Sequence, residues 1–147
     1  MKIDTNRQIE KLGEIGDEYN AYLIDLWGVV HNGIKLFPGI LNTLEELKVK
    51  KKEVIFITNA PRRSKVIKDQ LEEFGVSTKY YKDVVSSGEI SWLWMKKKSI
   101  ESSKKLACFH IGPQRDNNLL EEIDIIKTNI IKEANFVLNT GPWGDED

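Results

Sequence analysis

Two short apolar segments, each ending in small polar residues, constrain the fold of this chain more than any other feature. The segment Tyr22–Leu26 contains Asp25 near its end, and the segment Val54–Ile57 runs directly into Thr58 and Asn59. Buried parallel strands have this composition, and the open sheets that they form bind ligands beyond the carboxyl ends of the strands. The sequence therefore predicts an α/β fold with an active-site edge that includes Asp25.

Segments with helical periodicity alternate with these strands. One apolar stripe at helical spacing begins after Pro38, and a second begins near Pro61. A third strand at residues 83–85 leads into a helix that opens with Ser86 and Glu89, a pair with capping-box spacing. The order β-α-β-α-β-α predicts a parallel sheet with right-handed crossovers.

The character of the chain changes near residue 100. A polar, linker-like stretch is followed by further elements, which we predict as a strand at 106–111, a short helix around 119–122 and a last strand at 134–138. We therefore predict two domains, one of residues 1–100 and one of residues 101–147.

Charge and cysteine content limit the classes of partner. The formal net charge of -1 gives no bulk attraction to nucleic acid or to an anionic membrane. The lysine runs at 50–52 and 96–98 lie late in predicted helices, where cations favour the helix dipole, and we interpret them as solvated helix ends. Cys108 is the single cysteine, and we see neither a signal-peptide pattern nor an apolar run long enough to span a membrane. We expect a cytoplasmic protein with no nucleic-acid and no membrane partner.

Five short motifs follow one another along the chain. They are Ile-Asp-Leu-Trp-Gly-Val-Val-His-Asn-Gly at 24–33, Phe-Pro-Gly at 37–39, Ile-Thr-Asn-Ala-Pro-Arg at 57–62, Ser-Ser-Gly-Glu at 86–89 and Gly-Pro-Gln-Arg-Asp at 112–116. Their order and spacing resemble the haloacid dehalogenase (HAD) superfamily, and within it the class IIA hydrolases, the branch of sugar phosphatases and nitrophenylphosphatases. The resemblance implies a partial HAD-like core with a parallel sheet over residues 1–100, followed by the first part of an α/β cap domain over 101–147.

The resemblance also implies a mechanism. In this family the aspartate of the first strand attacks a phosphoryl group and forms an aspartyl-phosphate, which water hydrolyses. Asp25 would be the nucleophile and a Mg²⁺ ligand, and the backbone carbonyl of Trp27 would be a second ligand. The phosphate-binding residues that the resemblance implies are Thr58, Asn59, Gly28 and Arg62.

Two departures from the family pattern bear on catalysis. Most phosphatases of the family have an aspartate two residues after the nucleophile as general acid, and here that position is Trp27, which cannot transfer a proton. General acid help is worth about 10²–10⁴-fold, and His31 is a candidate substitute. The later lysine and acidic motif of the family are expected beyond residue 147, and we assign no metal role to the acidic cluster at 145–147.

Several hypotheses for function follow. The leading one is a Mg²⁺-dependent phosphomonoester hydrolase that acts on a small phosphorylated metabolite. Its main rival is a truncated or split-gene fragment that acts only with a complementing C-terminal polypeptide, or that self-associates through the exposed strand 22–26. A nucleotide-binding Rossmann unit is a poor third, because no Gly-x-Gly-x-x-Gly turn follows the first strand. Cys108 and His110 do not make a zinc site by themselves.

Overall fold

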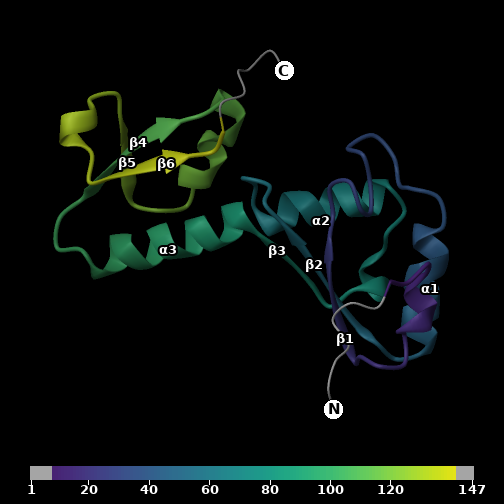
Figure 1. The fold of residues 1–147 in the computed structure, drawn as a ribbon. Helices are drawn as coiled ribbons and strands as arrows, with labels where there is room; N and C mark the ends of the chain where they lie inside the picture. Colours follow the sequence, from purple (N-terminus) through teal and green to yellow (C-terminus); the bar gives the residue numbers. More distant parts are fainter. Residues whose placement is uncertain (1–7, 142–147) are drawn as a thin grey trace. The chain divides into compact units, whose positions relative to one another are not determined.

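A computed structural model describes residues 8–141 of the chain, and Figure 1 labels its elements. The fold divides into two compact units. The first unit contains the described residues up to Ile57 together with Leu71–Asp83, and the second contains Thr58–Gln70 together with the described residues from Val84 onward. The predicted domain boundary near residue 100 falls close to the end of a helix at Glu101 and stays a prediction.

Strands and helices alternate in the order that the sequence predicts. The first six elements are β1 (Ala21–Asp25), α1 (Ile40–Val49), β2 (Glu53–Thr58), α2 (Ser64–Glu73), β3 (Asp83–Ser86) and α3 (Ser87–Glu101). The later strands are β4 (Leu106–Ile111), β5 (Ile125–Thr128) and β6 (Phe136–Asn139). Short 3-10 helices are η1 (Leu12–Glu14), η2 (Thr78–Tyr80), η3 (Gln114–Leu120) and η4 (Ile131–Glu133). The predicted α/β class is confirmed.

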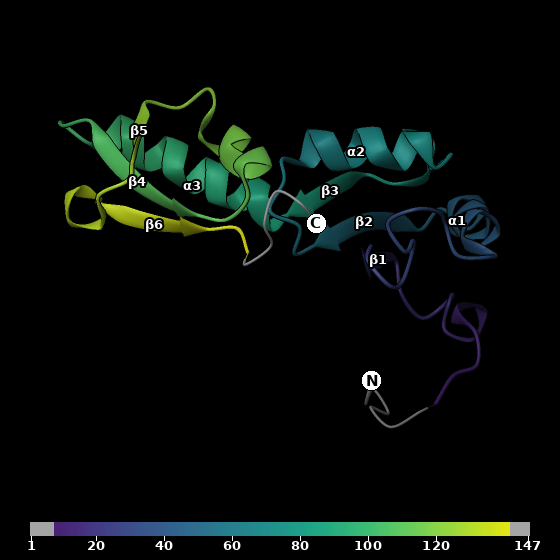
Figure 2. The ribbon, with the colours of Figure 1, turned by 90° about the horizontal axis from the view of Figure 1, so that it is seen from above.

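Two three-stranded sheets are present. The first has the order β1-β2-β3, and its β1–β2 pair is parallel, with Ala21 opposite Glu53 and Asp25 opposite Ile57. The second has the order β5-β4-β6, and β4 is parallel to both of its neighbours. α3 runs along the second sheet in both views (Figures 1 and 2).

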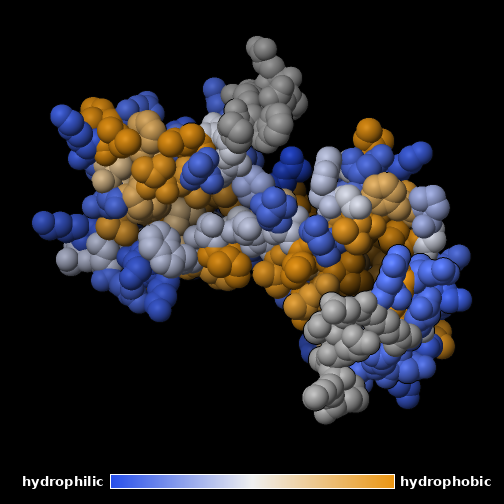
Figure 3. Space-filling view, viewed as in Figure 1, coloured by the Kyte–Doolittle hydropathy of each residue, from blue (hydrophilic) through white to orange (hydrophobic). Residues whose placement is uncertain are grey.

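Alternation of side chains along β1 and β2 gives their sheet one buried and one open face. Tyr22, Val54 and Phe56 are buried, as are Leu44 and Leu47 of α1, whereas Leu23 is 68% exposed and Ile57 is 37% exposed. Hydrophobic side chains accordingly gather over this region in Figure 3. Parallel sheets usually have both faces covered, so the open face is unusual for this type of sheet.

The second unit has its own core between α3 and the second sheet. Met95 of α3 packs with four buried residues of the sheet and of η3, namely Cys108, Leu119, Ile125 and Leu138. Trp92 on the same helix is buried, and its ring nitrogen donates a hydrogen bond to the Glu121 carbonyl at 2.9 Å. Together these contacts attach α3 to the sheet.

Three features differ from the sequence-based expectation. The helix predicted around 119–122 is the earlier 3-10 helix η3, and the strand predicted at 134–138 is displaced to Phe136–Asn139. The strand β5 was not predicted, because its four residues are too short to show alternation.

Among residues 8–141, no helix is long and apolar enough to cross a membrane. The predicted cytoplasmic location stays a prediction.

The core of the first unit is testable with two leucines of the same helix. Leu44 is 2% exposed and Leu41 is 39% exposed, both in α1. We expect Leu44→Ala to lower the free energy of unfolding by about 2–5 kcal/mol because it leaves a cavity. Leu41→Ala should cost about 1 kcal/mol or less. Denaturant unfolding of both variants measures the difference, and equal losses would contradict the assigned helix face.

Candidate active site

Asp25 is the last residue of β1 and has an exposed side chain. The backbone N–H of Leu26 donates a hydrogen bond to Asp25 Oδ1 at 2.9 Å, which fixes one carboxylate oxygen. Its register partner is Ile57, and Thr58 is the next residue along β2. The carboxylate therefore lies at the carboxyl end of a parallel strand pair, where ligands bind in open α/β sheets.

The segment after Asp25 folds back on itself in a tight turn. The amides of Val30 and His31 both donate to the Leu26 carbonyl, at 2.8 and 3.1 Å, and the Gly28 amide donates to the His31 carbonyl at 2.9 Å. Gly28 has a φ of 79°, a left-handed conformation that favours glycine. The Trp27 carbonyl takes no part in these three bonds, and the Trp27 side chain is 64% exposed.

The oxygen atoms of this turn fit part of a Mg²⁺ site. Mg²⁺ prefers carboxylate, carbonyl and phosphate oxygens in an octahedral arrangement, and Asp25 and the Trp27 carbonyl are donors of this kind. Within residues 8–141, no group of three or more His, Cys, Asp or Glu side chains is arranged to hold a metal ion. The acidic cluster at 145–147 lies outside the described residues. The assignment of Asp25 and the Trp27 carbonyl as Mg²⁺ ligands stays a prediction.

The segment between β2 and α2 belongs to the second unit and carries the other predicted residues. The Ala60 amide donates to Thr58 Oγ1 at 3.2 Å, so the hydroxyl hydrogen of Thr58 is left to donate elsewhere. Further along, the Arg62 carbonyl accepts a hydrogen bond of 2.6 Å from the Ser86 hydroxyl, and the Ala60 carbonyl accepts one of 3.1 Å from the Gly88 amide. The first turn of α3 therefore holds this loop in place.

Comparison with protein families decides the assignment. Residues 22–126 match the model of the haloacid dehalogenase-like hydrolases. The chain belongs to this family.

Curated relatives are longer than this family member. Phosphoglycolate phosphatase 2 of Arabidopsis thaliana is 28% identical over 132 residues, which are 89% of this chain and 38% of the relative. The 4-nitrophenylphosphatase of Schizosaccharomyces pombe is 28% identical over 85 residues, 57% of this chain and 28% of the relative. The chain thus spans well under half of the relatives that it matches.

Solved structures agree on the fold. A haloacid dehalogenase-like hydrolase of Brucella suis has a TM-score of 0.78 at 30% identity. The match covers 94% of this chain and 50% of the Brucella suis chain. A glycerol phosphate phosphatase of Mycobacterium tuberculosis, solved in complex with magnesium, has a TM-score of 0.60 at 20% identity. The match covers 86% of this chain and 37% of the Mycobacterium tuberculosis chain. The second similarity supports the fold alone.

The HAD residues predicted from sequence form two groups in the structure. Asp25, Trp27 and Gly28 lie together in the first unit. Thr58, Asn59 and Arg62 lie in the second unit. The convergence of both groups on one phosphate stays a prediction.

The amino terminus of α2 already has an anionic partner that sequence reasoning missed. The carboxylate of Glu89 accepts from the Ser64 amide at 2.9 Å, and it forms two hydrogen bonds with Arg63, at 2.8 and 3.2 Å. These hydrogen bonds, that from Arg63 foremost, hold the pKa of Glu89 below its ordinary value. The Ser64 amide at the start of α2 is therefore already paired with a carboxylate of the protein.

Arg63 is further fixed by an aromatic ring. Its guanidinium carbon lies 3.6 Å from the centroid of the Trp92 ring, a cation–π contact. The capping-box interpretation of Ser86 and Glu89 is therefore half right. The Ser86 hydroxyl accepts from the Glu89 amide at 3.1 Å, but the Glu89 side chain turns to Arg63.

His31, the candidate substitute acid, is a buried structural residue. Its Nδ1 accepts a hydrogen bond from the Gly33 amide at 3.0 Å, and its ring packs 5.2 Å from Phe74 and 6.1 Å from Trp27. Burial lowers the pKa of His31, against the opposite effect of the Asp25 charge. A neutral, enclosed imidazole is a poor proton donor at neutral pH.

The polar residues of the second sheet are also accounted for by protein contacts. His110 bridges Asn117 and Thr140, with Nδ1 3.0 Å from Asn117 Oδ1 and Nε2 2.9 Å from Thr140 Oγ1. Burial raises the pKa of the Cys108 thiol. The expectation that Cys108 and His110 hold no zinc stays a prediction.

Packing of α3 against the loop between β2 and α2 gives one prediction. A Cβ added at Gly88 would overlap the backbone of Arg62. We expect Gly88→Ala to lower the free energy of unfolding by about 1–3 kcal/mol, since overpacking displaces the backbone. Helix propensity alone would favour alanine. Denaturant unfolding measures the change. Gly13→Ala, which adds a methyl into open space, is the matched control, and a neutral Gly88→Ala would contradict the close approach.

Burial of His31 predicts a pH dependence of stability. The pKa is below its ordinary value of 6.5 in the folded chain, so the unfolded chain takes up a proton first as the pH falls. Stability should therefore drop below about pH 6.5. Thermal melts from pH 7.5 to 5 test this, and His31→Phe, which keeps an aromatic ring, should flatten the slope. Parallel slopes for the two proteins would contradict a buried neutral histidine.

Proposed function

We propose that this HAD-family chain provides the nucleophile and phosphate-binding loop of a Mg²⁺-dependent phosphomonoester hydrolase. The observation that carries the proposal is the exposed carboxylate of Asp25 at the end of β1, opposite Ile57 in the β1–β2 pair. An exposed carboxylate at this edge is accessible to a phosphoryl group, and the family match covers residues 22–126.

The hydrogen bond to Leu26 supports a specific role for each carboxylate oxygen. Oδ1 accepts from the Leu26 amide, so Oδ2 is the atom available to attack phosphorus. The new Oδ2–P bond forms as the bond from phosphorus to the ester oxygen breaks, which gives an aspartyl-phosphate on Asp25 and releases the leaving group as an oxyanion that takes a proton from solvent. Water then attacks the phosphorus, releases inorganic phosphate and restores the carboxylate.

The loop after β2 would hold the phosphoryl oxygens. The Thr58 hydroxyl is the primary donor, because its oxygen already accepts from Ala60 and its hydrogen is available. Asn59 and Arg62 follow on the same segment, and Gly28 allows a close approach since no side chain blocks it. Mg²⁺, when bound by Asp25 and the Trp27 carbonyl, would neutralise charge between the carboxylate and the phosphate.

The choice of substrate would follow from the missing general acid. Trp27 cannot donate a proton, and His31 is buried and held by Gly33. Without protonation, good leaving groups react far better than alkoxides. We therefore propose acyl or aryl phosphates as preferred substrates over sugar phosphates, within the class of small phosphorylated metabolites. Similarity to a 4-nitrophenylphosphatase is consistent with this preference.

A second candidate is that the chain acts only together with a complementing polypeptide. The chain spans 50% of the Brucella suis hydrolase, and the open face of β1 and β2 exposes apolar side chains such as Leu23. A partner that covers this face would complete the usual two-sided packing of a parallel sheet. Self-association through β1, an edge strand, is the competing use of the same surface.

One experiment separates the two candidates. Mg²⁺ with beryllofluoride mimics an aspartyl-phosphate, and a ligand that binds only the folded state raises the melting temperature. We expect the mimic to raise the melting temperature of the chain. Aryl phosphate turnover should fall by about a thousandfold or more in Asp25→Asn.

The control is Asp17→Asn, which removes an exposed aspartate paired with Lys50 at 2.9 Å. It should leave unchanged both the shift in melting temperature caused by the mimic and the aryl phosphate turnover. The chain alone could show neither a shift in melting temperature with the mimic nor turnover. If co-expression with the remaining half of a HAD relative restores both, the result favours the complementing polypeptide. Turnover that persists in Asp25→Asn would overturn the assigned nucleophile.

A further inference from the structure

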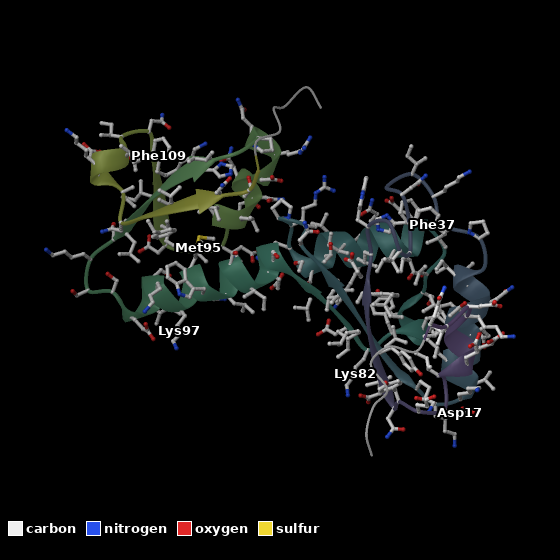
Figure 4. All side chains as sticks on the ribbon, viewed as in Figure 1. Asp17, Phe37, Lys82, Met95, Lys97 and Phe109 are labelled. Carbon is white, nitrogen blue, oxygen red and sulfur yellow. The ribbon has the colours of Figure 1, made fainter. Side chains whose placement is uncertain are left out.

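Lysines from two separate segments of the first unit line one pocket of about 330 Å³. Its lining residues come from the end of α1, the start of β2 and the η2 segment: Lys48, Lys51, Lys52, Glu53, Val54, Lys79, Tyr80, Tyr81 and Lys82. The pocket is a shallow depression of the surface and is largely open to solvent. Figure 4 labels Lys82, which lies just before β3.

The charge of this lysine pocket is strongly unbalanced. Its lining holds five lysines and one acidic residue, Glu53, which pairs with Lys82 at 2.8 Å. Outside the lining, Glu45 interacts electrostatically with Lys79, and Asp17 with Lys52. Among the residues that the structure describes, none of the other four lysines has a carboxylate oxygen within 4.0 Å. By contrast, Lys50 beside the pocket pairs with Asp17. Gathered like charges repel, and a bound anion would relieve that repulsion.

The backbone that carries Lys51 is held in a conformation that disfavours lysine. The Lys51 amide donates to the Lys48 carbonyl and the Lys52 amide donates to the Leu47 carbonyl, both at 2.9 Å, which is a Schellman ending of α1. Lys51 has a φ of 56°, the left-handed position that glycine usually occupies. A strained residue of this kind points to a functional reason for its presence.

Helix α2 shows the unstrained version of the same ending. There the amides of Gly75 and Val76 donate to the carbonyls of Glu72 and Leu71, at 2.9 and 2.8 Å, and the left-handed residue is glycine. At the end of α1 the same position is a lysine that borders the pocket.

An aromatic ring gathers two of the lysines. Lys79 Nζ lies 4.6 Å and Lys48 Nζ 5.7 Å from the centroid of the Tyr80 ring. Hydrogen bonding to Tyr80 also raises the pKa of Lys79, which stays charged. Because cations already occupy its face, the ring is not a platform for a nucleobase. The pocket is suited to the charged part of a ligand.

We infer that the lysine pocket binds a compact anion with at least two phosphate groups, either a free condensed phosphate or the phosphate chain of a nucleotide. Ammonium groups are point-charge donors that suit phosphate oxygens. The site is separate from Asp25: the pocket lies at Glu53, where β2 begins, and Asp25 lies opposite Ile57, four residues along the same strand. That separation is about 13 Å along the strand.

Titration calorimetry of the whole 147-residue chain tests the inference, in EDTA so that no divalent cation contributes. Tripolyphosphate should give saturable binding, and inorganic phosphate should bind at least about tenfold more weakly, since it reaches fewer lysines. ATP binding equal to that of tripolyphosphate identifies the phosphate chain as the recognised part, and weaker ATP binding favours a free condensed phosphate. No saturable binding of tripolyphosphate would overturn the inference.

Two variants and a control locate the site. Lys51→Gly should weaken tripolyphosphate binding about tenfold while raising the melting temperature, because glycine relieves the left-handed strain. Lys79→Gln should weaken binding without that stabilisation. Lys97→Gln with Lys98→Gln removes two charges from the exposed lysine run of α3 and should leave binding unchanged. Equal loss in this control, or equal binding of a single-stranded oligonucleotide at the same phosphate concentration, would overturn a compact built site.

Discussion

Parallel pairing of β1 with β2 is the interaction on which the rest of the structure depends. The register that puts Asp25 opposite Ile57 also puts Ala21 opposite Glu53. One strand pair thereby fixes a carboxylate at its carboxyl end and a lysine pocket at its amino end. The two ends differ in charge because the amino end receives the last turn of α1 and the η2 segment, both rich in lysine. Burial of Phe56 within the pair stabilises both ends together.

In the second unit, the carboxylate of Glu89 and the guanidinium of Arg63 form an ion pair. Glu89 occupies the first amide of α2, and Arg63 neutralises it while lying on the Trp92 ring. A buried or half-buried carboxylate is tolerated because each of its oxygens has a hydrogen-bond partner. Two further hydrogen bonds fix the loop that follows β2. The Ser86 hydroxyl donates to the Arg62 carbonyl, and the Gly88 amide donates to the Ala60 carbonyl. Rigidity of the loop is thus a property of α3 as much as of β2.

Much of the fold was predictable, because it rests on periodicity. The strands ending at Asp25 and Thr58 have apolar runs bounded by polar residues. Residues two apart on a helix point in different directions, which accounts for the exposures of 5% for Trp92 and 49% for Trp94. What could not be predicted depends on tertiary contacts. The Arg63–Glu89 pair joins residues 26 positions apart, and the lysines of the pocket come from segments that sequence alone does not bring together.

The open face of β1 and β2 connects the fold to the question of activity. A sheet with Leu23 exposed is stable only if the buried face supplies enough apolar contact, and Phe56, Val54 and Leu44 provide that contact. Covering the open face would add stability without altering the hydrogen bond that orients Asp25, because Leu26 provides it within the turn. Asp25, the proposed nucleophile, is therefore oriented by a contact within its own turn, whereas the predicted phosphate-binding residues of the loop after β2 belong to the second unit.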